Sequence, residues 1–192
     1  MKPEDVFYNG LWYRSQLAAR WAVFLDALDV GFRYEPQGFE IDSETLYWPD
    51  FWLPTLRCWL RIEETKPTGR TEAEARRLVF ITREPVYVFF GLIAVPDDNT
   101  MSAYFYGPCF DNKSSDEVLV DFDEMYWWCE CPFCSIVGIQ YQGRAARLPC
   151  RCVARLDHSL TKEYTFDSLR LVAAYQQAQI ARLGETRFHI EG

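Results

Sequence analysis

The sequence has no uninterrupted apolar run of about 18 residues, the length that a membrane-spanning helix needs. Its first residues, Met1–Asp5, lack the charged and then apolar layout of a secretory signal. Internal repeats and low-complexity stretches are absent as well. We therefore expect a soluble protein of the cytoplasm that has no membrane partner.

Basic residues are also in short supply. The 192 residues include 20 Lys and Arg against 28 Asp and Glu, which gives a net charge of −8. Proteins that hold nucleic acid through bulk charge usually carry a basic surface, so this balance argues against that mode of binding. Binding of nucleic acid through a local basic patch or a metal ion remains compatible with the acidic net charge. Hydrophobic residues make up 49% of the chain, which indicates a folded protein with a real core.

Hydrophobic periodicity predicts an α/β fold for the first hundred residues. Ser15 is a suitable N-cap for a helix over 15–29, whose apolar side chains recur at helical spacing. Thr71, with Glu74 three residues later, predicts a second helix that runs to about residue 82. Aromatic and β-branched runs predict strands over 32–35, 38–41, 45–53, 56–66 and 86–90. We summarise this order as α-β-β-β-α-β.

Five of the seven cysteines crowd into one segment and predict a metal site. Cys131 and Cys134 form a C-x₂-C pair, and Cys150 and Cys152 follow after fifteen residues. Two such pairs suit tetrahedral Zn²⁺, and four thiolates leave no open position for water, so the predicted zinc is structural. Cys152 is the preferred fourth ligand and Cys129 the alternate. The competing interpretation is a set of buried free thiols.

The cysteine segment completes the predicted domain organisation. Residues 136–141 and Gly143 predict the strand and turn of a zinc ribbon, and 103–106 with 118–122 predict a preceding hairpin. A final helix, over 166–183, is expected to pack on the body of the protein. The prediction is thus a core over 1–100, a hairpin and zinc-binding module over 101–160, and a C-terminal helix within 161–192.

Acidic and basic side chains are unevenly spread around the cysteines. Residues 131–156 contain no acid and four arginines, whereas 111–130 contain seven acids and one base. The arginines are Arg144, Arg147, Arg151 and Arg155. They could hold a DNA backbone, or they could pair with the acidic run. Similarly, Tyr126–Trp128 could stack on bases or cover the core of a small zinc module.

A carboxylate–lysine pattern lies on two of the predicted strands. Pro49–Asp50 is followed, after thirteen residues, by Glu64-Thr65-Lys66. Side chains at i and i+2 of a strand share a face, so Glu64 and Lys66 project together. If Asp50 lies on the neighbouring strand, Asp50 and Glu64 could hold Mg²⁺ or Mn²⁺ while Lys66 assists an attacking water. Alternation places Glu63 on the other, polar face, which favours Glu64. The competing interpretation is an ordinary exposed Glu–Lys pair.

Five segments carry a resemblance that covers nearly the whole chain: 13–26, Tyr34–Pro36, Pro49–Pro54, Glu64–Pro67 and Pro85–Val88. Together they resemble the PD-(D/E)XK nuclease superfamily, in particular small phage- and actinobacterium-type members with a cysteine-rich tail. The resemblance implies a restriction-endonuclease-like fold, with a mixed sheet flanked by helices. It also implies Mg²⁺-dependent hydrolysis of DNA, with Asp50, Glu64 and Lys66 in the catalytic positions.

Two features depart from that family pattern. Ala18 stands where such relatives usually carry a glutamate in the first helix, and the strand before Glu64 is longer by two residues. Glu35 or Asp26 could supply the missing acid. Two hypotheses follow. The first is a metal-dependent DNA nuclease, and the second is a catalytically inactive module that binds DNA or a protein, including a second copy of itself.

Overall fold

The computed structural model describes residues 5–41, 45–96, 102–108, 118–122, 125–143, 148, 150, 152, 166–184 and 186–187. Within them the fold is mixed α/β, with three helices around a six-stranded mixed sheet. The helices are α1 (Gln16–Ala27), α2 (Gly69–Thr82) and α3 (Leu169–Ile180). In spatial order the sheet consists of β10 (Val118–Asp121), β9 (Ser102–Pro108), β8 (Val86–Phe90), β7 (Cys58–Glu63), β6 (Phe51–Leu53) and β3 (Arg33–Tyr34).

Three smaller sheets surround the central one. They consist of β13 (Thr186–Arg187), β1 (Asp5–Tyr8) and β2 (Leu11–Tyr13); of β4 (Phe39–Glu40) and β5 (Leu46–Tyr47); and of β11 (Tyr126–Glu130) and β12 (Val137–Tyr141). The prediction missed β1 and β2, although Asn9–Gly10 between them is a strong hairpin signal. Both residues have the positive φ that such a turn requires, 47° and 84°.

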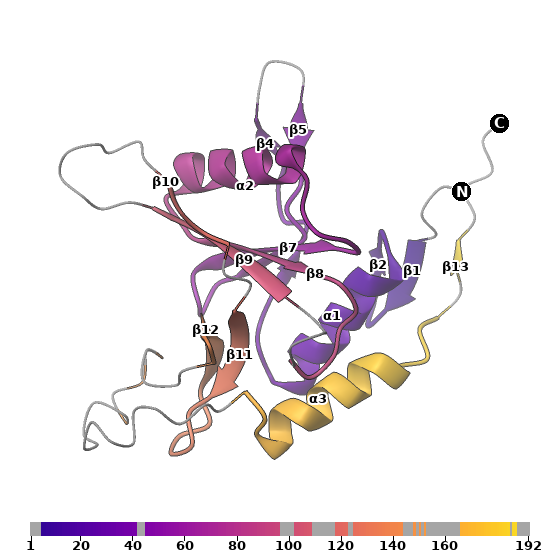
Figure 1. The fold of residues 1–192 in the computed structure, drawn as a ribbon. Helices are drawn as coiled ribbons and strands as arrows, with labels where there is room; N and C mark the ends of the chain where they lie inside the picture. Colours follow the sequence, from indigo (N-terminus) through magenta and orange to yellow (C-terminus); the bar gives the residue numbers. More distant parts are fainter. Residues whose placement is uncertain are drawn as a thin grey trace.

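The central sheet separates two hydrophobic layers (Figure 1). α2 covers one face, and its Leu78 and Val79 pack with Trp59, Val86 and Val88 of the sheet. α1 and α3 lie on the other side, where α3 packs on α1 and both helices share one hydrophobic cluster with the even-numbered apolar residues of β7. The predicted alternation of β7 therefore decides which side chains face which layer.

α1 begins as predicted, because the Ser15 hydroxyl accepts a hydrogen bond from the Ala18 amide at 3.0 Å. The predicted start of α2 is wrong. The N-cap is Thr68, three residues before the predicted Thr71, and the Thr71 hydroxyl donates instead to Glu63, at 3.4 Å. Pro67 lies just before this start, where its missing N–H is harmless.

β7 ends at Glu63, three residues before the predicted end of this strand. The parallel neighbour β8 ends at the paired residue, Phe90. On the other side the ladder with β6 begins at Phe51, opposite Leu60, so no strand of the sheet continues beside residues 64–66. The strand stops because its partners stop, which the local alternation of side chains cannot reveal.

The other predicted elements differ mainly in length. β8 and the β9–β10 hairpin are present, and α3 spans Leu169–Ile180 within the predicted 166–183. The strand predicted over 45–53 is interrupted at Trp48–Asp50, and its two halves join different sheets. α3 packs on α1, where the rings of Tyr175 and Phe24 lie 4.4 Å apart. No helix of the described residues is long and apolar enough to cross a membrane.

Candidate functional site

The first candidate site is built on the turn between β11 and β12. The Cys131 amide donates to the Ile136 carbonyl at 2.8 Å, and the Ser135 amide donates back to the Cys131 carbonyl at 2.9 Å. Ser135 takes a positive φ of 58°, which lets the chain reverse tightly. The turn thus presents Cys131 and Cys134 from one end of a short hairpin.

Four cysteine sulfurs converge at this turn. The sulfurs of Cys131, Cys134, Cys150 and Cys152 all lie within 4.8 Å of one another. A zinc ion bonded tetrahedrally at about 2.3 Å places its sulfur ligands about 3.8 Å apart, so the group fits such an ion. Cys129, the alternate ligand, lies on β11, opposite Gly138, and is not part of this group. The four cysteines could therefore hold a metal such as zinc.

Backbone amides prepare this site for anionic sulfur. Burial alone would raise the pKa of Cys131, but hydrogen bonds from the amides of Phe133 and Cys134 and from neighbouring thiols hold the pKa below its ordinary value. Cys131 is fully buried whereas Cys134 is exposed, so the group lies at the surface with one side turned inward.

One partly buried ion pair joins the cysteine turn to the core. Glu130 is 8% exposed and accepts hydrogen bonds from the Ser168 hydroxyl at 2.5 Å and from Arg170 at 3.2 Å. Arg170 also donates to the Ser135 carbonyl at 2.8 Å and to the Leu28 carbonyl at 2.5 Å. The cysteine turn, the end of α1 and the start of α3 are therefore joined through one guanidinium. The sequence analysis missed this pair, because 40 residues separate its members.

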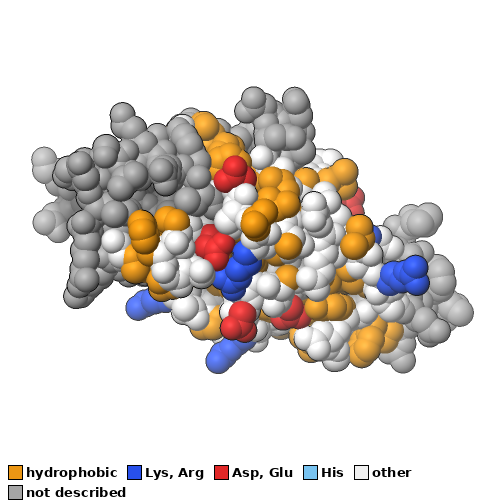
Figure 2. Space-filling model, turned by 90° about the horizontal axis from the view of Figure 1, so that it is seen from below, with side chains coloured by type: hydrophobic (Ala, Val, Ile, Leu, Met, Phe, Trp, Pro, Cys, Tyr) orange, Lys and Arg blue, Asp and Glu red, His pale blue; other side chains and the backbone are white. Residues whose placement is uncertain are grey.

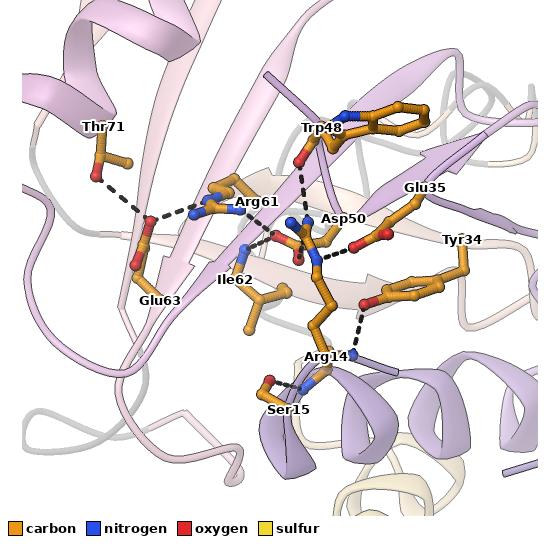
Figure 3. Close-up of polar contacts among 11 residues, drawn as sticks. Arg14, Ser15, Tyr34, Glu35, Trp48, Asp50, Arg61, Ile62, Glu63 and Thr71 are labelled. Carbon is orange, nitrogen blue, oxygen red and sulfur yellow. Dashed lines mark hydrogen bonds and ion pairs between the residues drawn. The ribbon is translucent and has the colours of Figure 1, made fainter. Parts of the chain in front are cut away.

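The second candidate site surrounds Asp50, which precedes β6 and is 6% exposed (Figure 3). One carboxylate oxygen accepts a hydrogen bond from the Ile62 amide at 2.8 Å and lies 3.4 Å from the Arg61 guanidinium. The other oxygen lies 4.0 Å from the guanidinium of Arg14. Two arginines and one amide therefore surround this carboxylate.

Arg61 and Arg14 extend the cluster in opposite directions. Arg61 donates to Glu63 at 2.9 Å, and its guanidinium lies 5.6 Å from the centre of the Tyr47 ring. Arg14 is ion-paired with Glu35 and donates to the Trp48 carbonyl at 3.2 Å. Each guanidinium thus bridges Asp50 to a second acid (Figure 3).

Burial outweighs these partners in setting the pKa of Asp50. Desolvation raises the pKa above its ordinary value, and Arg61, the Ile62 amide and Arg14 counteract only part of that increase. Burial would lower the pKa of Arg61, but Asp50, Tyr47 and Glu63 raise it above the ordinary value. Arg61 is therefore a fixed positive charge.

The structure places the other predicted catalytic residues differently from the expectation. Glu64 and Lys66 lie beyond the end of β7 and are exposed, so the expectation that they extend its apolar face is wrong. The Lys66 ammonium lies 5.6 Å from the centre of the Tyr104 ring. The acid that reaches the Asp50 cluster from this strand is Glu63, which the alternation argument had set aside. The catalytic roles of these residues stay predictions.

Among the described Asp, Glu, Cys and His residues, only the four cysteines form a group of three or more that could hold a metal. Glu35, the predicted additional acid, is near Asp50 but pairs with Arg14, and its amide donates to the Asp50 carbonyl at 2.9 Å. Arg144, Arg147, Arg151 and Arg155, predicted to contact DNA, lie outside the described residues.

Comparisons with known proteins give no family assignment for this chain: no protein-family model, no curated protein and no solved structure matches it.

Proposed function

We propose that this chain is a non-catalytic binding module, with a nuclease-like α/β core and a structural zinc ion, and that it binds a protein partner. The observation that carries the proposal is the environment of Asp50. The guanidinium of Arg61 lies 3.4 Å from this carboxylate, on the face where a catalytic ion would need a second carboxylate. The nuclease predicted from the resemblance is the second candidate, because Asp50 is buried beside the strand that precedes Glu64.

Catalytic magnesium does not fit this site. Mg²⁺ binds through one or two carboxylates together with water and substrate phosphate oxygens, and it tolerates little distortion of its octahedral geometry. Around Asp50 two guanidinium groups would repel a divalent cation. Ala18, at the position where the resemblance implies a glutamate, is buried and carries no ligand atom. These features support a site without hydrolytic chemistry.

Zinc fits the cysteine group much better. Four sulfurs within 4.8 Å of one another fill the coordination of a structural zinc ion, with Cys131, Cys134, Cys150 and Cys152 as its ligands. The bound ion would add the cross-link that this hairpin needs, because the apolar cluster beside it is small. We assign the ion a structural role only.

The described surface favours a protein partner over DNA. Figure 2 shows the molecule from the side of α3, where groups of apolar side chains lie scattered among polar atoms and charges of both signs. Phe133, Ile136 and Leu169 are exposed large apolar residues near the cysteine turn, with exposed fractions of 59%, 41% and 91%. A protein surface can cover such side chains, whereas a phosphate backbone attracts basic ones.

A cleavage assay tests the absence of hydrolysis. Supercoiled plasmid is incubated with wild-type protein and Mg²⁺ or Mn²⁺, beside a Lys66→Ala protein purified in parallel to account for contaminating nucleases. We expect equal, background cleavage from both. Cleavage by the wild type that Lys66→Ala abolishes would overturn the proposal and support the nuclease.

A binding assay tests the choice of partner. Fluorescence anisotropy with labelled single- and double-stranded DNA is measured on zinc-loaded protein at two salt concentrations. We expect no saturable DNA binding at physiological salt. Tight binding that weakens steeply with salt would instead make DNA the partner.

A further inference from the structure

α2 carries a basic face on the outside of the sheet, on the opposite side from α1 and α3 (Figure 1). The two acids of the helix, Glu72 and Glu74, lie in its first half, where Arg70 pairs with Glu74 at 2.9 Å. Its second half and its C-cap carry three exposed arginines instead: Arg76, Arg77 and Arg83. In a chain with a net charge of −8, these arginines form a local excess of positive charge.

Phe80 lies in the middle of this basic face. Leu78 packs on the sheet, and a side chain two residues further along a helix points to the other side. Phe80 therefore projects away from the sheet, yet it is only partly exposed. The guanidinium groups of Arg77 and Arg83 lie over its ring, at 5.1 Å and 4.9 Å from the ring centre. The ring thus supports two cations from the same helix.

The backbone of Arg83 has a conformation that favours glycine. Its φ is 59°, in the left-handed region, and its amide donates to the Val79 carbonyl at 2.8 Å where α2 ends. Glycine is the usual residue at such a helix end, because it takes this conformation without a steric cost. The residue found here instead is one whose side chain stacks on Phe80. Strain that is kept at an exposed position points to a role for the side chain.

Stacked guanidinium groups are suited to binding carboxylates. A guanidinium that lies over a ring contacts it with its flat face, and its N–H donors lie in the plane, at the edge that the ring does not cover. This edge binds a carboxylate through paired hydrogen bonds. Ile81, which is 40% exposed, follows Arg77 by one helical turn and adds an apolar side chain beside it. The face therefore combines cations with apolar surface.

We propose that the outward face of α2 binds an acidic segment of the protein partner, with its carboxylates on Arg77 and Arg83 and its apolar side chains on Phe80 and Ile81. Charge complementarity selects this occupant, because an acidic segment is attracted where arginines gather and a DNA duplex is repelled by the acidic remainder of the chain. A phosphate backbone would also leave the apolar side chains uncovered. The proposal rests on the proposed function, a protein partner, and names the chemistry of that partner.

Peptide binding tests the proposal, whereas DNA cleavage and DNA binding test the proposed function, so the two can fail separately. The probe is a labelled peptide in which Glu alternates with Leu and Phe, beside a peptide with Gln in place of every Glu. Fluorescence anisotropy is measured on zinc-loaded proteins. We expect the wild type to bind the acidic peptide saturably, less tightly as salt increases, and the Gln peptide at least about tenfold more weakly.

Two double variants with the same change in net charge locate the binding. Arg77→Gln/Arg83→Gln should weaken binding of the acidic peptide at least about tenfold, because it removes charge-assisted hydrogen bonds. Arg57→Gln/Arg70→Gln is the matched control, since both arginines are exposed and already pair with a glutamate, Glu84 and Glu74. It should weaken binding less than about twofold.

Arg83→Gly separates binding from a purely structural role. Glycine relieves the strain at this φ, so the unfolding temperature should not fall, whereas the affinity for the acidic peptide should fall several-fold. The proposal is overturned if the wild type does not bind the acidic peptide, if both double variants weaken binding equally, or if Arg83→Gly lowers stability and leaves affinity unchanged. Saturable binding of duplex DNA that Arg77→Gln/Arg83→Gln abolishes would also overturn it, and would make DNA the occupant of this face.

Discussion

The two polar centres of this molecule compensate charge in opposite ways. The cysteine group brings four ligands of one kind together. The Asp50 cluster brings acids and arginines together, so that each acid already has a positive partner. The comparison teaches that convergence of ligand atoms alone does not make a metal site. A site calls for an external ion only where the chain supplies no cation of its own.

The largest expected effect concerns the four cysteines, which need an external metal ion. Cys134→Ser removes one of four zinc ligands, and metal binding to such sites provides on the order of 10 kcal/mol of folding free energy in small zinc modules. We expect zinc content to fall from about one ion per chain to nearly none. The hairpin should unfold, which is visible as loss of near-ultraviolet circular dichroism from its tryptophans. Metal analysis and circular dichroism measure both.

Cys129→Ala is the control for that experiment. Cys129 is buried on β11 and lies outside the group of four sulfurs, so its replacement should preserve the zinc content even if it lowers stability. Loss of zinc from this variant, together with its retention in Cys152→Ser, would reverse the assignment of the fourth ligand.

The second effect concerns the ion pair between Glu130 and Arg170. Arg170→Met leaves the largely buried Glu130 with the Ser168 hydroxyl as its one partner among the described side chains, and it also frees two carbonyl groups. Since the Arg170 side chain is 37% exposed, we expect a cost of about 2–3 kcal/mol in unfolding free energy, below that of a fully buried pair. Urea unfolding measures it.

Hydrogen exchange adds a readout that locates the effect of Arg170→Met. Faster exchange should appear in the cysteine turn and at the start of α3, because Arg170 joins these two parts. Arg182→Met, at an exposed arginine shortly after the same helix, is the control and should change neither stability nor exchange. An equal effect of both variants would show that Arg170 does not couple the turn to the core.

The two centres also differed in how far the sequence could predict them. The cysteine ligands follow from local spacing, since Cys131–Cys134 and Cys150–Cys152 each lie within a few residues. The partners of Asp50 depend on where β7 stops, and this is set by Phe90 of the parallel neighbour and by the start of β6. Alternation correctly predicted the buried face of β7, but not that Glu63 rather than Glu64 joins the cluster.

A third effect should appear in the pH dependence of the contribution that Asp50 makes to stability. Since the pKa of Asp50 is raised in the folded state, the folded protein holds this proton to higher pH than the unfolded chain does. The contribution of Asp50 to stability is therefore full at low pH and is lost as pH rises through the folded pKa. The charged and titratable groups around it are Arg14, Tyr34, Glu35, Tyr47, Arg61, Glu63 and Glu74.

Asp50→Asn isolates that effect. The unfolding free energy of the wild type relative to Asp50→Asn should increase as pH falls from neutral toward the ordinary carboxyl range, and zinc loss affects both proteins alike. A difference that stays constant with pH, or that decreases, would mean that Arg61 and Arg14 compensate the buried charge fully.

The smallest effect compares two helix caps, one beside each polar centre. Ser15 caps α1 beside Arg14, and its hydroxyl accepts a hydrogen bond from the Ala18 amide. Ser168 caps α3, accepts from the Leu171 amide at 3.2 Å and donates to the buried Glu130. We expect Ser15→Ala to cost about 1 kcal/mol and Ser168→Ala about 2 kcal/mol, because the second change removes a bond to a buried charge as well as a cap.

Thr68→Ala provides the baseline, since Thr68 precedes α2 without a side-chain capping bond and its replacement should cost little. Urea unfolding of the zinc-loaded proteins gives the loss in unfolding free energy for each of the three variants, and we expect these losses to increase from Thr68→Ala through Ser15→Ala to Ser168→Ala. If chelation of the zinc reduces the cost of Ser168→Ala to that of Ser15→Ala, the ion and the cap act through the same turn. If the cost of Ser168→Ala is unchanged without zinc, the core alone holds Glu130 and its partners in place. The zinc-bound hairpin then depends on these residues for its position, and their position does not depend on the zinc.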